Sequence, residues 1–320
     1  MSQVVRDLII IGAGPAGLTA AIYAARSRLS TLLLEAQYPG GQAFNTHRID
    51  NYPGFPDGVS GPDLTEAMSR QAQVHGAELL TAQVQSLELS GSPKRVVSSE
   101  GEYAAHTVII ATGADPRKLG VPGEAQFTGR GVSYCATCDG PFFRGRRVAV
   151  VGGGDSALTD ALYLARLASD VVLIHRRDRF RGVKALQERI AADERIRVIT
   201  PAVVEAIEGQ DSVTGVRLGA PPSGAVPAPG AAAVPERVEV EGVFIYVGTT
   251  PATAFCPGEL QVDAAGYVMA DEEMRTSVDG VFAAGDVRSK SLRQVVTAAG
   301  DGAIAAMNCE AWLAERGLIS

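Results

Sequence analysis

Residues 7–17 read DLIIIGAGPAG, and this segment predicts the type of fold that the chain adopts. Its apolar run ends in a glycine-rich turn, a helix-compatible stretch follows at 18–25, and a second apolar run at 31–34 ends at Glu35. Strand, glycine turn, helix and strand in this order give the dinucleotide-binding fingerprint its meaning. The glycines permit a tight turn and let backbone amides approach a pyrophosphate at the helix N-terminus, while Glu35 can accept hydrogen bonds from an unphosphorylated ribose.

The same unit occurs a second time, beginning with VAVVGGGDSA at residues 148–157. A helix-like stretch runs from there to about residue 168, and an apolar strand at 171–174 ends at His175. The spacing from the first glycine of the turn to the end of the second strand is the same in both units. One glycine fingerprint is a weak signal, whereas two at equal spacing are a strong one.

The two units differ in the charge that follows their second strand. Glu35 stands there in the first unit, and Arg176, Arg177 and Arg181 stand there in the second. A carboxylate repels a 2′-phosphate, whereas arginines bind one through charge-assisted hydrogen bonds. We therefore predict FAD at the first unit and NADPH, in preference to NADH, at the second. The alternative for the basic run 176–184 is a solvated helix face or a patch for an anionic surface.

The remaining segments arrange these units into an α/β fold of two Rossmann-like domains. Connectors at 116–123 and 247–251 resemble crossings between domains, so the second unit is expected to be inserted within the first. The predicted FAD domain comprises residues 1–116 and 247–320. The predicted NADPH domain comprises residues 117–246. A Pro/Ala/Gly tract at 220–235 is expected to be an exposed loop that joins two strands and carries no chemistry.

Composition limits the function classes. The chain has 320 residues, a net charge of −7 and a pI of about 5.2, which argues against a nucleic-acid-binding surface. The stretch 8–25 contains no charged residue, but Gly12, Gly14, Pro15 and Gly17 interrupt it, so we expect no membrane span and no export. Four cysteines in a chain of this length indicate a reducing compartment, which we take to be the cytoplasm.

Two of the four cysteines form a pair, in SYCATCDG at residues 133–140. Cys135 and Cys138 can cycle between disulfide and dithiol, and Asp139 is a candidate proton donor or acceptor beside them. Two alternatives are a structural zinc site and a pair of buried apolar side chains. Zinc needs four ligands, but the other candidates are scattered along the chain, so no metal is expected; they are Cys256, Cys309, His47, His75, His106 and His175.

With these residues in view, the chain resembles the low-molecular-weight thioredoxin reductases over essentially its whole length. The most specific motif is CATCDG at 135–140, which is supported by both glycine turns, by GGQ at 40–42 and by Gly285-Asp286. The resemblance implies a homodimer that passes electrons from NADPH through FAD and the Cys135–Cys138 disulfide to thioredoxin or a thioredoxin-like protein. It also implies that Cys138 faces the flavin and Cys135 faces the partner.

The resemblance implies a set of cofactor contacts as well. The FAD contacts would be Gly12, Gly14, Ala16, Gly17, Glu35, Gly41, Gln42, Asn51, Val84, Ala111, Thr112, Gly113, Asp286, Arg293, Gln294 and Val295. The NADPH contacts would be Gly154, Asp155, Ser156, His175, Arg176, Arg177 and Arg181. One departure from the family pattern is Asp155, where asparagine is common, and a carboxylate near the pyrophosphate would weaken NADPH binding slightly.

Three other functions compete with this interpretation. The flavoprotein subunit of a peroxide-reducing system shares the stretch Cys138-Asp139-Gly140-Pro141, but it carries an extra N-terminal redox domain, for which this sequence leaves no room before Gly12. A ferredoxin–NADP reductase of similar fold lacks the cysteine pair. A redox sensor would bind NADPH but would not reduce an added disulfide protein.

Overall fold

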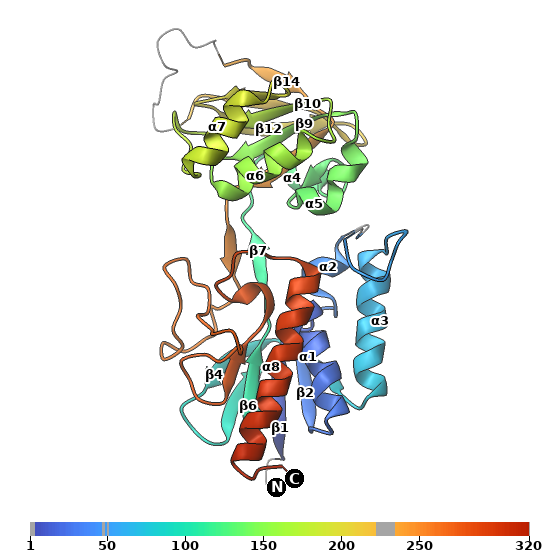
Figure 1. The fold of residues 1–320 in the computed structure, drawn as a ribbon, viewed down its shortest axis with the longest axis vertical. Coiled ribbons are helices and arrows are strands. Elements are labelled where there is room, and N and C mark those ends of the chain that lie inside the picture. The colour runs from blue at the N-terminus through green and yellow to red at the C-terminus, as the bar shows by residue number, and fades with distance from the viewer. Residues whose placement is uncertain (1–3, 47–48, 50, 222–233, 320) are drawn as a thin grey trace. The chain divides into compact units, whose positions relative to one another are not determined.

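The structure, a computed structural model, describes residues 4–46, 49, 51–221 and 234–319. The chain divides into two compact units: unit 1 comprises Met1–Asp115 and Thr250–Ser320, and unit 2 comprises Pro116–Thr249. The chain passes between the units at β7 (Ala114–Pro116) and β16 (Thr249–Pro251), which pair with each other (Figure 1). Unit 2 is therefore inserted in the sequence of unit 1.

Unit 1 is built on a seven-stranded sheet with the order β3-β2-β1-β6-β5-β4, and β17 also pairs with β6. Its strands are β1 (Val5–Ile11), β2 (Thr31–Glu35), β3 (Glu78–Thr81), β4 (Val84–Glu88), β5 (Lys94–Ser98), β6 (Gly101–Ile110) and β17 (Val281–Ala283). The strands β3, β2, β1, β6 and β17 pair in parallel, whereas β4 and β5 add an antiparallel edge. The apolar run of β1 suits a strand that is covered on both faces.

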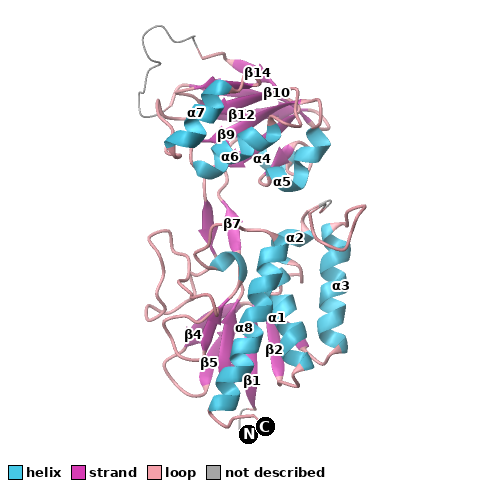
Figure 2. Cartoon of the chain, in the orientation of Figure 1, coloured by secondary structure: helices cyan, strands magenta, loops and turns pink. Residues whose placement is uncertain are grey.

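Two layers cover the faces of this sheet. Three helices pack on one face, namely α1 (Pro15–Arg26), α3 (Gly61–Val74) and α8 (Val295–Glu315) (Figures 1 and 2). On the other face the apolar side chains of β4 and β5 pack with Leu260 and Val268 of the segment before β17. Helices α1 and α8 approach closely at Gly302, where a β-carbon would collide with the carbonyl group of Ala16. A short helix, α2 (Gly41–Phe44), precedes α3.

Unit 2 contains a five-stranded parallel sheet with the order β11-β10-β9-β15-β8 and a three-stranded antiparallel sheet, β12-β13-β14. The parallel strands are β8 (Val132–Ser133), β9 (Arg147–Gly152), β10 (Asp170–Ile174), β11 (Ile196–Ile199) and β15 (Gly242–Tyr246). The antiparallel strands are β12 (Val203–Gly209), β13 (Val213–Gly219) and β14 (Arg237–Glu239). The α/β class with two Rossmann-like units is confirmed.

The parallel sheet of unit 2 also lies between two layers. Helix α6 (Asp155–Leu164) packs on one face, together with Leu186 and Ile190 of α7 (Lys184–Ala192). The antiparallel sheet packs on the other face through Val204, Val216 and their neighbours. Three short elements complete the unit, namely α4 (Glu124–Phe127), α5 (Ala136–Asp139) and the 3-10 helix η1 (Gly140–Phe143).

Several local expectations differ from the structure. The sequence pattern after Arg293 predicts a helix that ends near Met307. Helix α8 instead continues to Glu315, because Cys309 and Leu313 are buried and the next residue with a left-handed backbone is Gly317. Helix α6 ends at Leu164, earlier than residue 168. The predicted loop at 220–235 falls between β13 and β14, but its residues 222–233 lie outside the described residues. Among the described helices, none is long and apolar enough to cross a membrane.

Candidate active site and nucleotide-binding turns

The cysteine pair lies in residues 133–139, which we call the redox turn. Cys135 and Cys138 follow the carboxyl end of β8, and a disulfide joins them across α5 with their Cα atoms 5.3 Å apart. Both residues are half-buried. The predicted pairing is confirmed, and it supplies a couple that can alternate between disulfide and dithiol.

The other two cysteines have a different environment. Cys256 and Cys309 are free thiols, and Cys309 is fully buried. Burial raises the pKa of the half-buried Cys256 to about 11 and raises the pKa of the fully buried Cys309 further, because a thiolate loses solvation when water is excluded. Neither thiol is suited to nucleophilic chemistry. In the described part of the chain, no group of three or more His, Cys, Asp or Glu side chains is arranged to hold a metal ion.

Hydrogen bonds hold the backbone of the redox turn. The amide of Cys135 donates to Ser133 Oγ at 3.1 Å, and the amide of Cys138 donates to Cys135 Sγ at 3.2 Å. Ser133 Oγ also donates to Asp139 Oδ2 at 2.6 Å, which fixes this carboxylate beside the pair. The hydroxyl of Thr137 lies 3.4 Å from Cys135 Sγ. Polar groups therefore converge on the sulfur of Cys135.

Three residues of this site were missed by reasoning from the sequence. Ser133 stands two positions before the first cysteine, where the sequence pattern indicates no role for it. Tyr246 ends β15, and its hydroxyl accepts a hydrogen bond from the amide of Ala136 at 2.6 Å; Asp160 on α6 is bonded in turn to Tyr246. The position of Tyr246 at the end of an apolar strand was the available signal, but the neighbours of that strand cannot be read from the sequence.

The first glycine turn, Gly12–Gly17, joins β1 to α1. A β-carbon at Gly12 would lie 2.5 Å from the carbonyl oxygen of Ala111, and one at Gly17 would collide with the carbonyl of Gly12. At Gly14, by contrast, a β-carbon would meet no described atom within 4 Å. The turn is therefore tightly packed at Gly12 and Gly17 and open at Gly14. An open backbone at the start of a helix lets a pyrophosphate approach the amides.

The predicted ribose-binding carboxylate is held at this turn. Glu35 at the end of β2 accepts hydrogen bonds from Ala13 N at 2.7 Å and from Gln37 N at 3.1 Å. The next strand of the sheet brings in Thr81 opposite Glu35, and Val84 follows at the start of β4. Glu35 thus contacts the turn directly, whereas Val84 lies three residues after Thr81 in the chain.

The other predicted FAD contacts lie in further segments of unit 1. Gly41 lies against Gly14, since a β-carbon at Gly41 would lie 3.2 Å from the Gly14 Cα atom. The neighbouring Gln42 side chain donates to Asp115, and Thr112 Oγ1 donates to the carbonyl of Ala252 at 2.8 Å. Gly113 has a left-handed backbone. Asn51 Nδ2 donates to Gln294 Oε1 at 2.9 Å, directly before Val295 opens α8.

Asp286, in the same unit, has one carboxylate oxygen without a hydrogen-bond partner among the described residues. Its Oδ1 atom is buried and accepts no hydrogen bond within the described chain, and Lys290 Nζ lies 4.0 Å away. Burial raises the pKa of Asp286, and the positive charges of Lys290 and Arg293 offset part of that rise. Arg293, whose guanidinium lies 4.2 Å from the ring centre of Tyr267, likewise has a buried Nε atom that no described group satisfies. Such unsatisfied polar atoms fit a polar ligand like the ribityl chain of FAD.

The second glycine turn, Gly152–Ala157, joins β9 to α6. A β-carbon at Gly153 would collide with the ring of His175, whereas at Gly154 it would meet no described atom within 4 Å. Asp155 Oδ1 accepts a hydrogen bond from Val183 N at 2.7 Å. This carboxylate, expected to lie near a pyrophosphate, is therefore engaged with the segment before α7, while Ser156 is exposed.

The basic residues lie beside this turn. The amide of Arg181 donates to the carbonyl of Gly153 at 2.7 Å, so the loop folds back onto the turn. The side chains of Arg176, Arg177 and Arg181 are exposed. His175 is buried, with Nε2 at 3.2 Å from the carbonyl of Arg179. Burial lowers the pKa of His175, and the nearby arginines lower it further, so the ring stays neutral and the guanidinium groups carry the charge.

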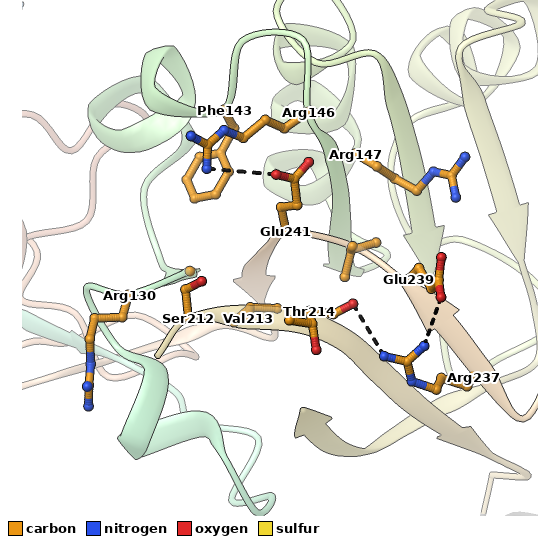
Figure 3. A pocket seen from close by; sticks show the side chains of 12 residues that line it. Arg130, Phe143, Arg146, Arg147, Ser212, Val213, Thr214, Arg237, Glu239 and Glu241 are labelled. Carbon is orange, nitrogen blue, oxygen red and sulfur yellow. Dashed lines mark hydrogen bonds and ion pairs between the residues drawn. The ribbon is translucent and has the colours of Figure 1, made fainter. Parts of the chain in front are cut away.

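A pocket of about 600 Å³ lies elsewhere in unit 2 (Figure 3). Its charged lining consists of Arg130, Arg146, Arg147, Arg237, Glu239 and Glu241. Arg237 pairs with Glu239, and Arg146 lies 3.9 Å from Glu241, so the positive charge is partly neutralised. The pocket borders the residues at which β9 and β15 begin, whereas nucleotides bind where parallel strands end. We therefore assign it no part in nucleotide binding.

Comparisons with known proteins agree with this arrangement. A family model described as pyridine nucleotide-disulphide oxidoreductase matches residues 6–302. The thioredoxin reductase of Listeria monocytogenes is 46% identical over 97% of this chain and 94% of its own length. The bifunctional thioredoxin reductase/thioredoxin of Mycobacterium leprae is 45% identical over 98% of this chain and 67% of its own length. The crystal structure of thioredoxin reductase from Streptococcus pyogenes matches with a TM-score of 0.87 at 46% identity, covering 98% of this chain and 100% of that one.

These matches extend over both units and include the two glycine turns and the redox turn. The resemblance drawn from the sequence motifs is thereby confirmed. The chain belongs to the pyridine nucleotide-disulphide oxidoreductase family and, within it, to the thioredoxin reductases.

Proposed function

We propose that this chain is an NADPH-dependent thioredoxin-disulfide reductase that contains FAD. The observation that carries the proposal is the Cys135–Cys138 disulfide, held in the same compact unit as a glycine turn flanked by exposed arginines. A disulfide and a binding turn for a phosphorylated nucleotide are two of the parts that such a reductase needs, beside its flavin. The thioredoxin reductase relatives support the assignment of thioredoxin, or a thioredoxin-like protein, as the partner.

Unit 1 is proposed to bind FAD. The first glycine turn would receive the pyrophosphate, and Glu35 would accept hydrogen bonds from the adenosine ribose. Asp286 and Arg293 would complete the site through the polar atoms that the described chain leaves unsatisfied. The remaining proposed contacts are Gly41, Gln42, Asn51, Val84, Ala111, Thr112, Gly113, Gln294 and Val295.

Unit 2 is proposed to bind NADPH. Gly154, Asp155 and Ser156 open helix α6, whose N-terminal amides would face the pyrophosphate. The exposed guanidinium groups of Arg176, Arg177 and Arg181 would bind the 2′-phosphate, and His175 would support the loop from below. Support for this assignment comes from the arginine cluster at the strand end, where an NADH site would carry a carboxylate.

When bound, FAD supplies two-electron transfer from NADPH to the redox turn. The chain's own residues perform the thiol chemistry. Two electrons and two protons convert the Cys135–Cys138 disulfide into a dithiol. The thiolate of Cys135 then attacks the partner's disulfide, Cys138 attacks the resulting mixed disulfide, and the reduced partner leaves as the Cys135–Cys138 bond forms again. Asp139, fixed by Ser133, would accept and return the proton of Cys138.

We further propose that the protein works as a homodimer in the cytoplasm. The proposal on location rests on the need for a reduced environment in which the free thiols Cys256 and Cys309 persist. The proposal of a dimer rests on the resemblance to the thioredoxin reductases. Sedimentation of the FAD-loaded protein would give the mass of two chains, and a single-chain mass would contradict the dimer.

The proposed function is tested by NADPH oxidation with the purified yellow protein. Oxidised thioredoxin should start NADPH consumption and should appear as dithiol in equal amount. Without thioredoxin, only slow oxidation is expected. Consumption that does not depend on thioredoxin, or flavin reduction without any thioredoxin dithiol, would contradict the assignment.

A further inference from the structure

The redox turn is attached to the central sheet of unit 2 through Tyr246. The amides of Cys135, Cys138 and Asp139 bind acceptors that lie within residues 133–139. The amide of Ala136 instead donates to the hydroxyl of Tyr246 at 2.6 Å. This bond reaches across 110 positions of sequence to the last residue of β15. It therefore connects the segment that carries the sulfurs to the rigid part of the unit.

A second side chain orients the Tyr246 hydroxyl. Asp160 on α6 makes a side-chain hydrogen bond with Tyr246, which leaves the oxygen of the phenol free to accept from Ala136. Burial raises the pKa of Tyr246 well above its usual value, and the nearby carboxylates Asp160 and Asp139 raise it further. Burial also raises the pKa of Asp160. The phenol therefore keeps its proton and acts as a fixed hydrogen-bonding group.

Tyr246 and Asp160 belong to the elements that also carry or adjoin the second glycine turn. Tyr246 pairs with Gly152 at the end of β9, and Asp160 lies on α6, which begins directly after the turn. The two side chains thus extend from the nucleotide-binding framework to the redox turn. Displacement of Ala136 would move the amide of Cys138 and the hydroxyl of Thr137 away from the Cys135 sulfur.

We propose that Tyr246, oriented by Asp160, is a positioning residue that aligns the Cys138 amide and the Thr137 hydroxyl on Cys135 Sγ and so stabilises a thiolate at Cys135 in the reduced pair. The inference deepens the proposed function, since it rests on this pair being the one that reacts with thioredoxin. Hydrogen bonds to a thiolate favour the charged form, so their loss raises the thiol pKa.

The test compares Tyr246→Phe with Tyr134→Phe in the full-length, FAD-loaded protein. Tyr134 is a matched control, because it is also half-buried and adjoins Cys135, but its hydroxyl donates to Glu124 at 2.9 Å. Each protein is reduced with a phosphine, the phosphine is removed, and iodoacetamide labelling is followed across pH by peptide mass spectrometry. The Tyr246→Phe change should move the midpoint of Cys135 labelling upward by about one pH unit. The Tyr134→Phe change should leave it in place.

A second pair of variants separates orientation from folding damage. Asp160→Asn retains an acceptor for the Tyr246 hydroxyl and should label like the wild type, whereas Asp160→Leu removes it and should label like Tyr246→Phe. Unchanged labelling in both Tyr246→Phe and Asp160→Leu would overturn the proposal. If Tyr246→Phe does not fold, the two Asp160 variants decide alone.

The labelling experiment uses neither NADPH nor thioredoxin, so it can fail independently of the proposed function. If thioredoxin is reduced normally while Cys135 labelling ignores Tyr246, the positioning role is wrong and the reductase assignment stands. If Cys135 labelling follows Tyr246 but thioredoxin is not reduced, the proposed partner is wrong and the positioning role stands.

Discussion

The two glycine turns share their local construction but differ in what they present at the second strand end. In unit 1 the carboxylate of Glu35 accepts a hydrogen bond from the amide of Ala13, so a negatively charged side chain lies beside the turn. In unit 2 the ring of His175 lies where a β-carbon of Gly153 would be, and arginines follow on the surface. The difference supports our proposal that the side chains after the strand select the nucleotide, whereas the backbone of the turn would provide a phosphate site in both units.

The first and largest test concerns chemistry that unit 2 has and unit 1 lacks. Cys135→Ser or Cys138→Ser should reduce thioredoxin turnover to background, because a single thiol cannot both form and resolve a mixed disulfide. Cys256→Ser and Cys309→Ser, the matched changes in unit 1, should keep turnover near wild type. Steady-state NADPH oxidation measures all four. NADPH should still bleach the flavin in the first two variants, and full turnover by Cys138→Ser would contradict the mechanism.

A second change makes the strand end of unit 2 less like an NADPH site. Changing both Arg176→Ala and Arg177→Ala should lower the preference for NADPH over NADH by roughly 10²-fold or more. Each charge-assisted hydrogen bond that is lost contributes about 1.5–3 kcal/mol. The comparison of kcat/KM for the two nucleotides measures the effect. Arg189→Ala, an exposed arginine on α7, is the control and should leave the ratio unchanged. Equal use of both nucleotides by the wild-type protein would refute the role of this cluster.

A third test compares two adjacent glycines of the second turn. Gly153→Ala forces a β-carbon into the His175 ring and should destabilise the protein by about 1–3 kcal/mol, the usual cost of overpacking. Gly154→Ala meets no described atom within 4 Å and should fold normally, but its methyl group would lie on the open side of the turn and should weaken NADPH binding. Thermal unfolding and nucleotide titration separate the two effects. Equal melting temperatures for Gly153→Ala and the wild type would show that the histidine ring moves freely.

The smallest expected effect concerns the protonation of His175. Burial and the arginines lower its pKa in the folded protein, so the unfolded chain binds more protons as pH falls through the ordinary value of 6.5. The neutral ring therefore contributes stability that is present above pH 6.5 and is lost as pH decreases below it. His175→Gln should flatten the decrease in melting temperature between pH 7.5 and 5.5. His75→Gln, an exposed histidine in unit 1, should not change that slope.

The parts of the fold that were predicted from sequence are those that local patterns determine. Apolar runs and glycines identify β1, β9 and the turns after them, because a strand buried on both faces and a tight turn restrict residue type position by position. The predicted end of helix α8 near Met307 was wrong, because tertiary packing buries Cys309 and Leu313 and extends the helix beyond its clearest local pattern. Tertiary packing overrides local preference at such ends.

The candidate site was predictable to the same degree. Cys135, Cys138 and Asp139 are neighbours in sequence, so their proximity follows from covalent connection. Tyr246 and Asp160 reach the redox turn only because β15 lies between β9 and β8, and strand order is a property of the whole sheet. No local pattern contains that order.

The pairing of β7 with β16 has a consequence for engineering. Both ends of unit 2 leave through two hydrogen-bonded strands, so the cut points at residues 115/116 and 249/250 are about one strand spacing apart, roughly 5 Å. A short peptide bridge could close unit 1 at this point, and residues 116–249 could be transplanted as a cassette into another host protein at a hairpin. The β7–β16 pair is therefore a boundary at which unit 2 could be exchanged for another domain without altering the main sheet of unit 1.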